Sequence, residues 1–250
     1  MTKEHTAALL RLLSLEYGCT PGDFRKSGNI LTVSALREGQ RRYQPDPYFF
    51  HMATLGGNAV LTADERLHPF LSEWSRGKPG IWLFEFPNLL PLERELNRFG
   101  YTLTQSHHLY LPAGEALPKR NDPVKWLFGR AEIDPFYGDP RFPNALCSAY
   151  TPERPDTVAV CALDGEKMMG MAGCSEDAPG WEQIGIDVLP EYRARGVGTY
   201  LVTLLKNEIL RHGKIPFYGT GLSNCNSQKI ALSCGFRPAW VEIGAKRIHE

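Results

Sequence analysis

The sequence lacks any run of about eighteen apolar residues, the length that a membrane-spanning helix needs. We therefore expect no membrane segment. Residues 1–19 have the pattern of an amphipathic helix and carry too many charges for a secretory signal. Neither sign of charge is in excess, because 28 lysine and arginine residues balance 28 aspartate and glutamate residues. Such a chain has no overall field that attracts nucleic acid or an anionic membrane, so any anion site must be local.

Cysteine is present, but not in the patterns that hold zinc or form a secreted disulfide framework. The six cysteines, at positions 19, 147, 161, 174, 225 and 234, include no Cys-x-x-Cys pair. We therefore expect reduced thiols, a cytoplasmic protein and no metal site. The octet Gly-x-x-x-x-Gly-Lys-Ser/Thr of a P-loop is absent too, which leaves an NTPase function without support.

The most informative stretch that is present runs from Ile184 to Gly198. An apolar strand passes through Pro190 into the turn Arg193-x-x-Gly196-x-Gly198, and apolar residues at helical spacing follow over 196–212. Glycines at a helix N-terminus favour an anion, because unpaired backbone N–H groups point outward there. A dinucleotide fingerprint would need a third glycine at position 201, where the chain has Leu201.

A second signature lies downstream. After a short apolar strand at 215–220, residues 224–236 read as an asparagine that opens a helix, which closes on Gly235-Phe236 before a final strand over 236–243. Together the two motifs resemble those of the GNAT superfamily, the GCN-five-related acyltransferases, over residues 155–250. The resemblance implies a GNAT acyl-CoA fold and acetyl-CoA (coenzyme A) as the cofactor.

The resemblance also implies where the cofactor would lie. A strand that splays from its neighbour would hold the pantetheine arm and thioester, and backbone N–H groups of the turn would take the pyrophosphate, with arginines adding charge. The implied cofactor-binding residues are Ile186, Asp187, Val188, Arg193, Ala194, Arg195, Gly196, Val197, Gly198, Thr199, Asn224 and Ser227.

Catalysis needs a group that takes the proton of the attacking amine and a group that protonates the departing thiolate. Glu182, six residues before Val188, is the first candidate base by resemblance to histone-modifying members, and Asp187 is the second. Many GNAT enzymes place a tyrosine where this chain has Ala231. Tyr218 is our candidate acid, and Tyr200, Ser227 or a water are alternatives.

The pattern as a whole predicts an α+β (mixed α/β) protein of two halves, an N-terminal α/β domain at 1–118 and a GNAT domain at 119–250. In the first half we expect strands at 48–54, 58–62, 81–86 and 102–111 and helices at 63–76 and 89–99. Asp164-Gly165 predicts a hairpin between strands at 157–163 and 167–174. Both halves contain a helix, a glycine with an aromatic residue, and then a strand, so the first half is a candidate degenerate GNAT-like copy that shapes the acceptor site. The Pro-rich stretch 134–143 is a candidate cover for that site.

These observations predict an acetyl-CoA-dependent N-acetyltransferase that moves an acetyl group directly to a primary amine of a small molecule or peptide. A catalytically silent acyl-CoA-binding module is the first alternative, favoured by Ala231. A phosphate-ligand site without coenzyme A is the second, and it requires the second signature to be accidental.

Overall fold

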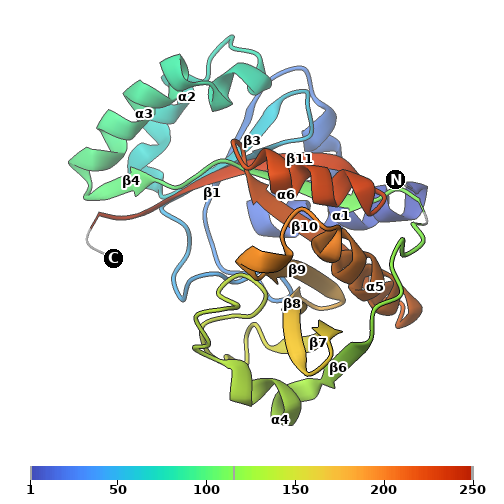
Figure 1. Cartoon of the computed structure of the whole chain (residues 1–250). Helices are drawn as coiled ribbons and strands as arrows, with labels where there is room; N and C mark the ends of the chain where they lie inside the picture. Colours follow the sequence, from blue (N-terminus) through green and yellow to red (C-terminus); the bar gives the residue numbers. More distant parts are fainter. Residues whose placement is uncertain (1, 115, 249–250) are drawn as a thin grey trace.

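The computed structural model describes residues 2–114 and 116–248, and within these ranges the strands form one eleven-stranded mixed sheet (Figure 1). The strand order is β1-β3-β2-β11-β5-β10-β9-β8-β7-β6, and β4 pairs with β11 off this path. The strands are β1 (Ile30–Val33), β2 (Phe50–Thr54), β3 (Ala59–Ala63), β4 (Tyr101–Leu103), β5 (His107–Pro112), β6 (Val124–Phe128), β7 (Asp156–Asp164), β8 (Lys167–Ala178), β9 (Trp181–Val188), β10 (Ile215–Gly221) and β11 (Phe236–Arg247).

Helices cover both faces of the sheet. The helix α5 packs its apolar stripe, with Leu201 and Leu205, on β7 to β9, whereas α1 packs Leu9 and Leu13 on the opposite face against Trp181. No helix in the described ranges is long and apolar enough to cross a membrane. The α-helices are α1 (Lys3–Tyr17), α2 (His68–Trp74), α3 (Phe86–Arg98), α4 (Gly129–Ile133), α5 (Val197–Arg211) and α6 (Cys225–Ser233).

The two halves of the chain share strands at the middle of the sheet. β5, from the first half, lies between β10 and β11, and β11 pairs in turn with β2 of the first half. The length of β11 allows this, because its first residues pair with β5 and its later ones with β2 and β4. Strands from both sides of the predicted domain boundary at residue 118 therefore belong to one sheet. The boundary itself remains a prediction.

The predicted mixed α/β class is confirmed, and so is the hairpin at Asp164-Gly165, where Gly165 has a φ of 59°. Both halves also contain the helix-glycine-strand junction, with Gly100 and Gly235 at positive φ. The common origin of the two halves remains a prediction.

The predicted strand at 81–86 is wrong. Residues Gly80–Phe84 form a 3-10 helix, and α3 starts at Phe86. Prolines bracket this apolar run, and Pro87 suits the first turn of a helix. Two other predicted elements are divided. The helix expected at 63–76 is split into a 3-10 turn at Glu65–Leu67 and α2, which begins at His68 with Pro69 in its first turn, and the strand expected at 102–111 is split into β4 and β5.

A buried ion triad joins the halves on the α1 face. The Arg41 guanidinium donates to Glu16 of α1, with Nε–Oε1 and Nη2–Oε2 distances of 2.7 Å, and also to Glu242 of β11, at 2.8 Å for Nη2–Oε2. Burial opposes ionisation of Glu242, but the charge of Arg41 prevails and lowers the pKa of this carboxyl group to about 2. The triad therefore fixes the segment around Arg41 between the first helix and the last strand.

Candidate functional site

A groove of about 1200 Å³ opens where β9 and β10 diverge. Their parallel pairing runs from Trp181 to Ile184 on β9 and ends at Tyr218 on β10. Beyond this point β10 remains paired with β5, whereas in the described chain residues 185–188 of β9 keep only β8 as a partner. Apart from the Val188 carbonyl, which accepts from Arg193 Nε, backbone N–H and C=O groups on this edge of β9 are thus available to a ligand.

The groove connects the two faces of the sheet. Side chains alternate along a strand, so Ile184 and Ile186 face α5, whereas Gln183 and Asp187 face the opposite side with Trp181. We call these the helix side and the loop side of the groove.

On the helix side, the turn before α5 contains two residues at positive φ. Gly196 is the N-cap of α5 with a φ of 80°, and Ala194 has a φ of 59°, which is strained for a residue with a Cβ. Arg193 donates from Nε to the Val188 carbonyl oxygen over 3.0 Å, which ties the turn to the end of β9. The N-terminus of α5 therefore presents free N–H groups to the groove.

The N-terminus of α6 meets the same side. Asn224 caps it by accepting a hydrogen bond from the Ser227 backbone N–H over 3.2 Å. Both helix termini line the groove, so their dipoles favour negative charge at one end of it.

Most of the predicted cofactor residues are brought together here. Those that line the groove are Ile186, Asp187, Val188, Arg193, Ala194, Gly196, Val197, Gly198, Thr199, Asn224 and Ser227. Arg195 is the exception: its guanidinium lies 5.7 Å from the Tyr192 ring centroid, and its carbonyl oxygen accepts from Arg120 Nη1 over 2.6 Å. Arg195 borders a smaller cavity instead.

Tyr218 lines the groove at the point of divergence. Its hydroxyl lies 2.7 Å from Ser227 Oγ, and burial raises the pKa of this phenol to about 12. The hydroxyl therefore keeps its proton at neutral pH, which is the state required of a proton donor.

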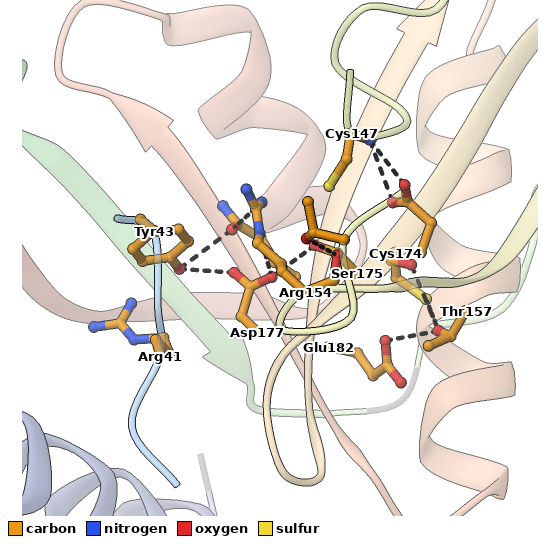
Figure 2. Close-up of polar contacts among 12 residues, drawn as sticks. Arg41, Tyr43, Cys147, Arg154, Thr157, Cys174, Ser175, Asp177 and Glu182 are labelled. Carbon is orange, nitrogen blue, oxygen red and sulfur yellow. Dashed lines mark hydrogen bonds and ion pairs between the residues drawn. The ribbon is translucent and has the colours of Figure 1, made fainter. Parts of the chain in front are cut away.

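The two predicted bases occupy different positions. Glu182 is buried outside the groove lining, where its carboxylate forms an ion pair with Lys214 and accepts from Thr157 Oγ1 over 2.8 Å. Figure 2 shows Glu182 and Thr157 together, away from Tyr43.

Asp187 lines the groove and binds the segment at 143–148, which also borders the groove and which we call the covering segment. Its carboxylate accepts from the backbone N–H groups of Asn144 and Ala145, at 2.7 and 2.8 Å, and from Asn144 Nδ2 at 2.7 Å. The segment lies so close to the sheet that a Cβ on Gly185 would sit 1.8 Å from the Asn144 carbonyl oxygen. Of the stretch 134–143, only Pro143 borders the groove, and the covering segment continues to Ser148.

The loop side also contains a polar network that sequence reasoning missed. Tyr43, from the first half, donates from its hydroxyl to Asp177 over 2.7 Å, and Arg154 donates to the same carboxylate from Nε over 2.7 Å (Figure 2). No motif marks these residues, because they come from two loops and the end of β8.

His107 lies at the start of β5. Its imidazole is half-buried and lines the groove, and no hydrogen-bond or ion-pair partner contacts it within residues 2–114 and 116–248. Its position depends on the insertion of β5 beside β10, which local sequence patterns do not indicate.

Comparison with known proteins finds a family match in the second half of the chain, where most of the groove lining and the turn before α5 lie. Residues 124–236 match the family model described as "Acetyltransferase (GNAT) family". No curated protein matches the sequence.

Solved structures extend the similarity of fold to the first half. A GCN5-related N-acetyltransferase-like protein from Streptococcus suis is 13% identical, with a TM-score of 0.52, and the match covers 96% of this chain and 100% of that one. A Drosophila protein is 14% identical, with a TM-score of 0.51 and coverage of 99% and 97%. A GNAT-family acetyltransferase described as putative, from Novosphingobium aromaticivorans, is 17% identical, with a TM-score of 0.47 and coverage of 58% and 66%, so the chain spans slightly less than two thirds of that relative.

Proposed function

We propose that this chain, whose residues 124–236 match the GNAT acetyltransferase family model, transfers an acetyl group from acetyl-CoA directly to the primary amine of an acceptor. We further propose that the acceptor is a small molecule or peptide and that the protein is cytoplasmic. Acetyl-CoA, when bound, supplies a thioester as the acetyl donor.

The observation that carries the proposal is the divergence of β9 from β10 beside the N-termini of α5 and α6. Free backbone groups on residues 185–188 suit an extended amide-containing arm, and the turn from Ala194 to Thr199 suits the pyrophosphate at its end. The donor would thus occupy the helix side, which leaves the loop side to the acceptor.

Amide formation requires that the amine nitrogen bonds to the carbonyl carbon, that the carbon–sulfur bond breaks, and that one proton leaves the amine while the sulfur gains one. Tyr218 holds a proton at the point of divergence, and Ser227 orients its hydroxyl over 2.7 Å. We assign Tyr218 as the proton donor in place of the tyrosine that is replaced by Ala231.

For the amine proton we propose His107 rather than either carboxylate. Glu182 is ion-paired outside the groove, and three N–H donors from the segment at 144–145 already engage the Asp187 carboxylate. His107 lines the groove with its imidazole uncommitted among the described residues, and a histidine is well suited to accept a proton near neutral pH.

A silent acyl-CoA-binding module remains the second candidate. The engagement of both predicted carboxylates by other groups favours it, as does Ala231. It shares the helix side of the groove with the first candidate but requires no acceptor.

Calorimetry and a thiol-release assay separate these candidates. We expect heat on titration with both CoA and acetyl-CoA, and free thiol release from acetyl-CoA in the presence of some members of a primary amine panel. If neither CoA nor acetyl-CoA gives heat, the cofactor assignment is wrong. Binding of acetyl-CoA without thiol release for any amine of the panel would support the silent module.

Replacement of Tyr218 by phenylalanine tests the proton donor. We expect Tyr218→Phe to lower kcat about tenfold to a hundredfold with little change in the KM for acetyl-CoA, because only the departing sulfur loses its proton source. The matched control is Tyr110→Phe. Tyr110 of β5 pairs with Tyr218 of β10 and is as deeply buried as Tyr218, but it does not line the groove. Equal kcat values for the two variants would remove Tyr218 from this role.

The base is tested by a neighbouring pair of histidines. His107→Gln should lower kcat/KM for the amine by about a hundredfold, whereas His108→Gln, on the opposite face of the same strand, should change it less than twofold. An unchanged rate in His107→Gln, together with a large loss in Glu182→Gln or Asp187→Asn, would return the role to the carboxylates.

A further inference from the structure

The loop side of the groove contains a guanidinium group that is held in one orientation. Arg154 donates from Nε to Asp177 Oδ1 over 2.7 Å and from Nη2 to Gln183 Oε1 over 3.2 Å. Its guanidinium carbon lies 5.0 Å from the Tyr43 ring centroid. These contacts fix the plane of the group before any ligand arrives.

The anchor of this group is a buried carboxylate. Asp177 has a side chain that is 0% exposed, and it accepts from Ser175 Oγ over 2.6 Å and from Tyr43 Oη over 2.7 Å in addition to Arg154. Because Asp177 is packed among its donors, it positions Arg154 without reaching into the groove.

Arg154 retains donors for a ligand. A guanidinium has five N–H bonds, and its contacts with Asp177 and Gln183 use one on Nε and one on Nη2. Within the described residues, Nη1 has no hydrogen-bond partner. The Arg154 side chain lines the groove and is 31% exposed. The edge formed by Nη1 and Nη2 is therefore available as a planar two-donor fork.

Nearby acidic groups do not compete for this fork. Asp156 accepts from the Cys147 backbone N–H over 3.1 Å, and Asp187 is engaged by the covering segment. An uncharged ligand would leave the Arg154 donors poorly paired in a partly desolvated site, at a cost in affinity.

We propose that the acceptor carries a carboxylate as well as its amine, and that Arg154 binds this carboxylate on the loop side of the groove. The inference rests on the proposed function and names its substrate class as small molecules of the amino-acid type. The Nη1–Nη2 edge matches a carboxylate in a two-bond arrangement. A phosphate dianion is a poorer match, because the other cations of the groove, Arg193 and Lys229, come from the turn before α5 and from α6 at the helix side.

The first half takes part in this recognition through Tyr43. The Tyr43 ring packs against the Arg154 guanidinium, and the Tyr43 hydroxyl donates a hydrogen bond to Asp177 (Figure 2). The acceptor end of the groove is thus built by both halves, whereas the cofactor end is built by β9, α5 and α6.

The test compares amino acids with their amides in the unaltered protein. Thiol release from acetyl-CoA is followed with amino acids, the matching C-terminal amides and the matching amines without the carboxyl group. We expect kcat/KM at least tenfold higher for the carboxylate-bearing member of a matched set. Equal rates for amides, or a preference for a phosphate-bearing amine such as phosphoethanolamine, would overturn this inference alone. No release with any amine would overturn the proposed function with it.

A charge-preserving variant adds a binding readout. Arg154→Lys retains the positive charge beside Asp177 but loses the fork, so we expect KM for the amino acid to rise at least tenfold while kcat/KM for the amide changes less than twofold. Calorimetry of the amino acid with CoA-saturated protein should show the same loss of affinity. Arg211→Lys, which alters an exposed pair with Glu208, is the control. Unchanged amino acid affinity in Arg154→Lys would contradict the assignment.

Discussion

The ion triad of Glu16, Arg41 and Glu242 is the interaction on which the arrangement of the two halves depends. It joins residues from the first helix, an irregular segment and the last strand, whose side chains are 7%, 1% and 11% exposed. Desolvation of three charges is costly, and the cost is recovered only when both carboxylates keep their hydrogen bonds to the guanidinium. These hydrogen bonds therefore fix the segment around Arg41 between α1 and β11.

The triad is linked to the site through Tyr43, which lies two residues after Arg41 in the chain. The Arg41 guanidinium packs against the rings of Tyr43, Phe217 and Trp240. The Tyr43 hydroxyl donates to Asp177, which in turn accepts from Arg154. The helix side of the groove has a different basis, because it depends on strand divergence and on two helix N-termini. The two sides of the groove, to which we assign the donor and the acceptor, therefore rest on separate parts of the molecule that meet at the opening between β9 and β10.

The parts of the site that the sequence predicts are those built by continuous segments. The turn before α5 and the cap of α6 are local structures, in which glycine and asparagine have direct conformational reasons, and their residues line the groove with the exception of Arg195. The fold class and the hairpin follow from periodicity in the same way.

The remaining parts depend on contacts between distant segments. The insertion of β5 between β10 and β11 places His107 at the groove, and Tyr43 reaches Asp177 across 134 residues of sequence. No periodicity in either segment indicates such a contact. The apolar run at 81–86 was likewise not predictable from its composition. The flanking prolines and tertiary packing favour a 3-10 helix there instead of a strand.

We infer that the Arg41 triad holds the two halves together on the α1 face, and equilibrium unfolding of Arg41→Gln beside Arg42→Gln tests this role. Arg42 is exposed, so its replacement should change the free energy of unfolding by less than about 0.5 kcal/mol. Arg41→Gln leaves two buried carboxylates without their cation and should lower it by about 3–5 kcal/mol. Equal stability of the two variants would show that the triad does not hold the two halves together.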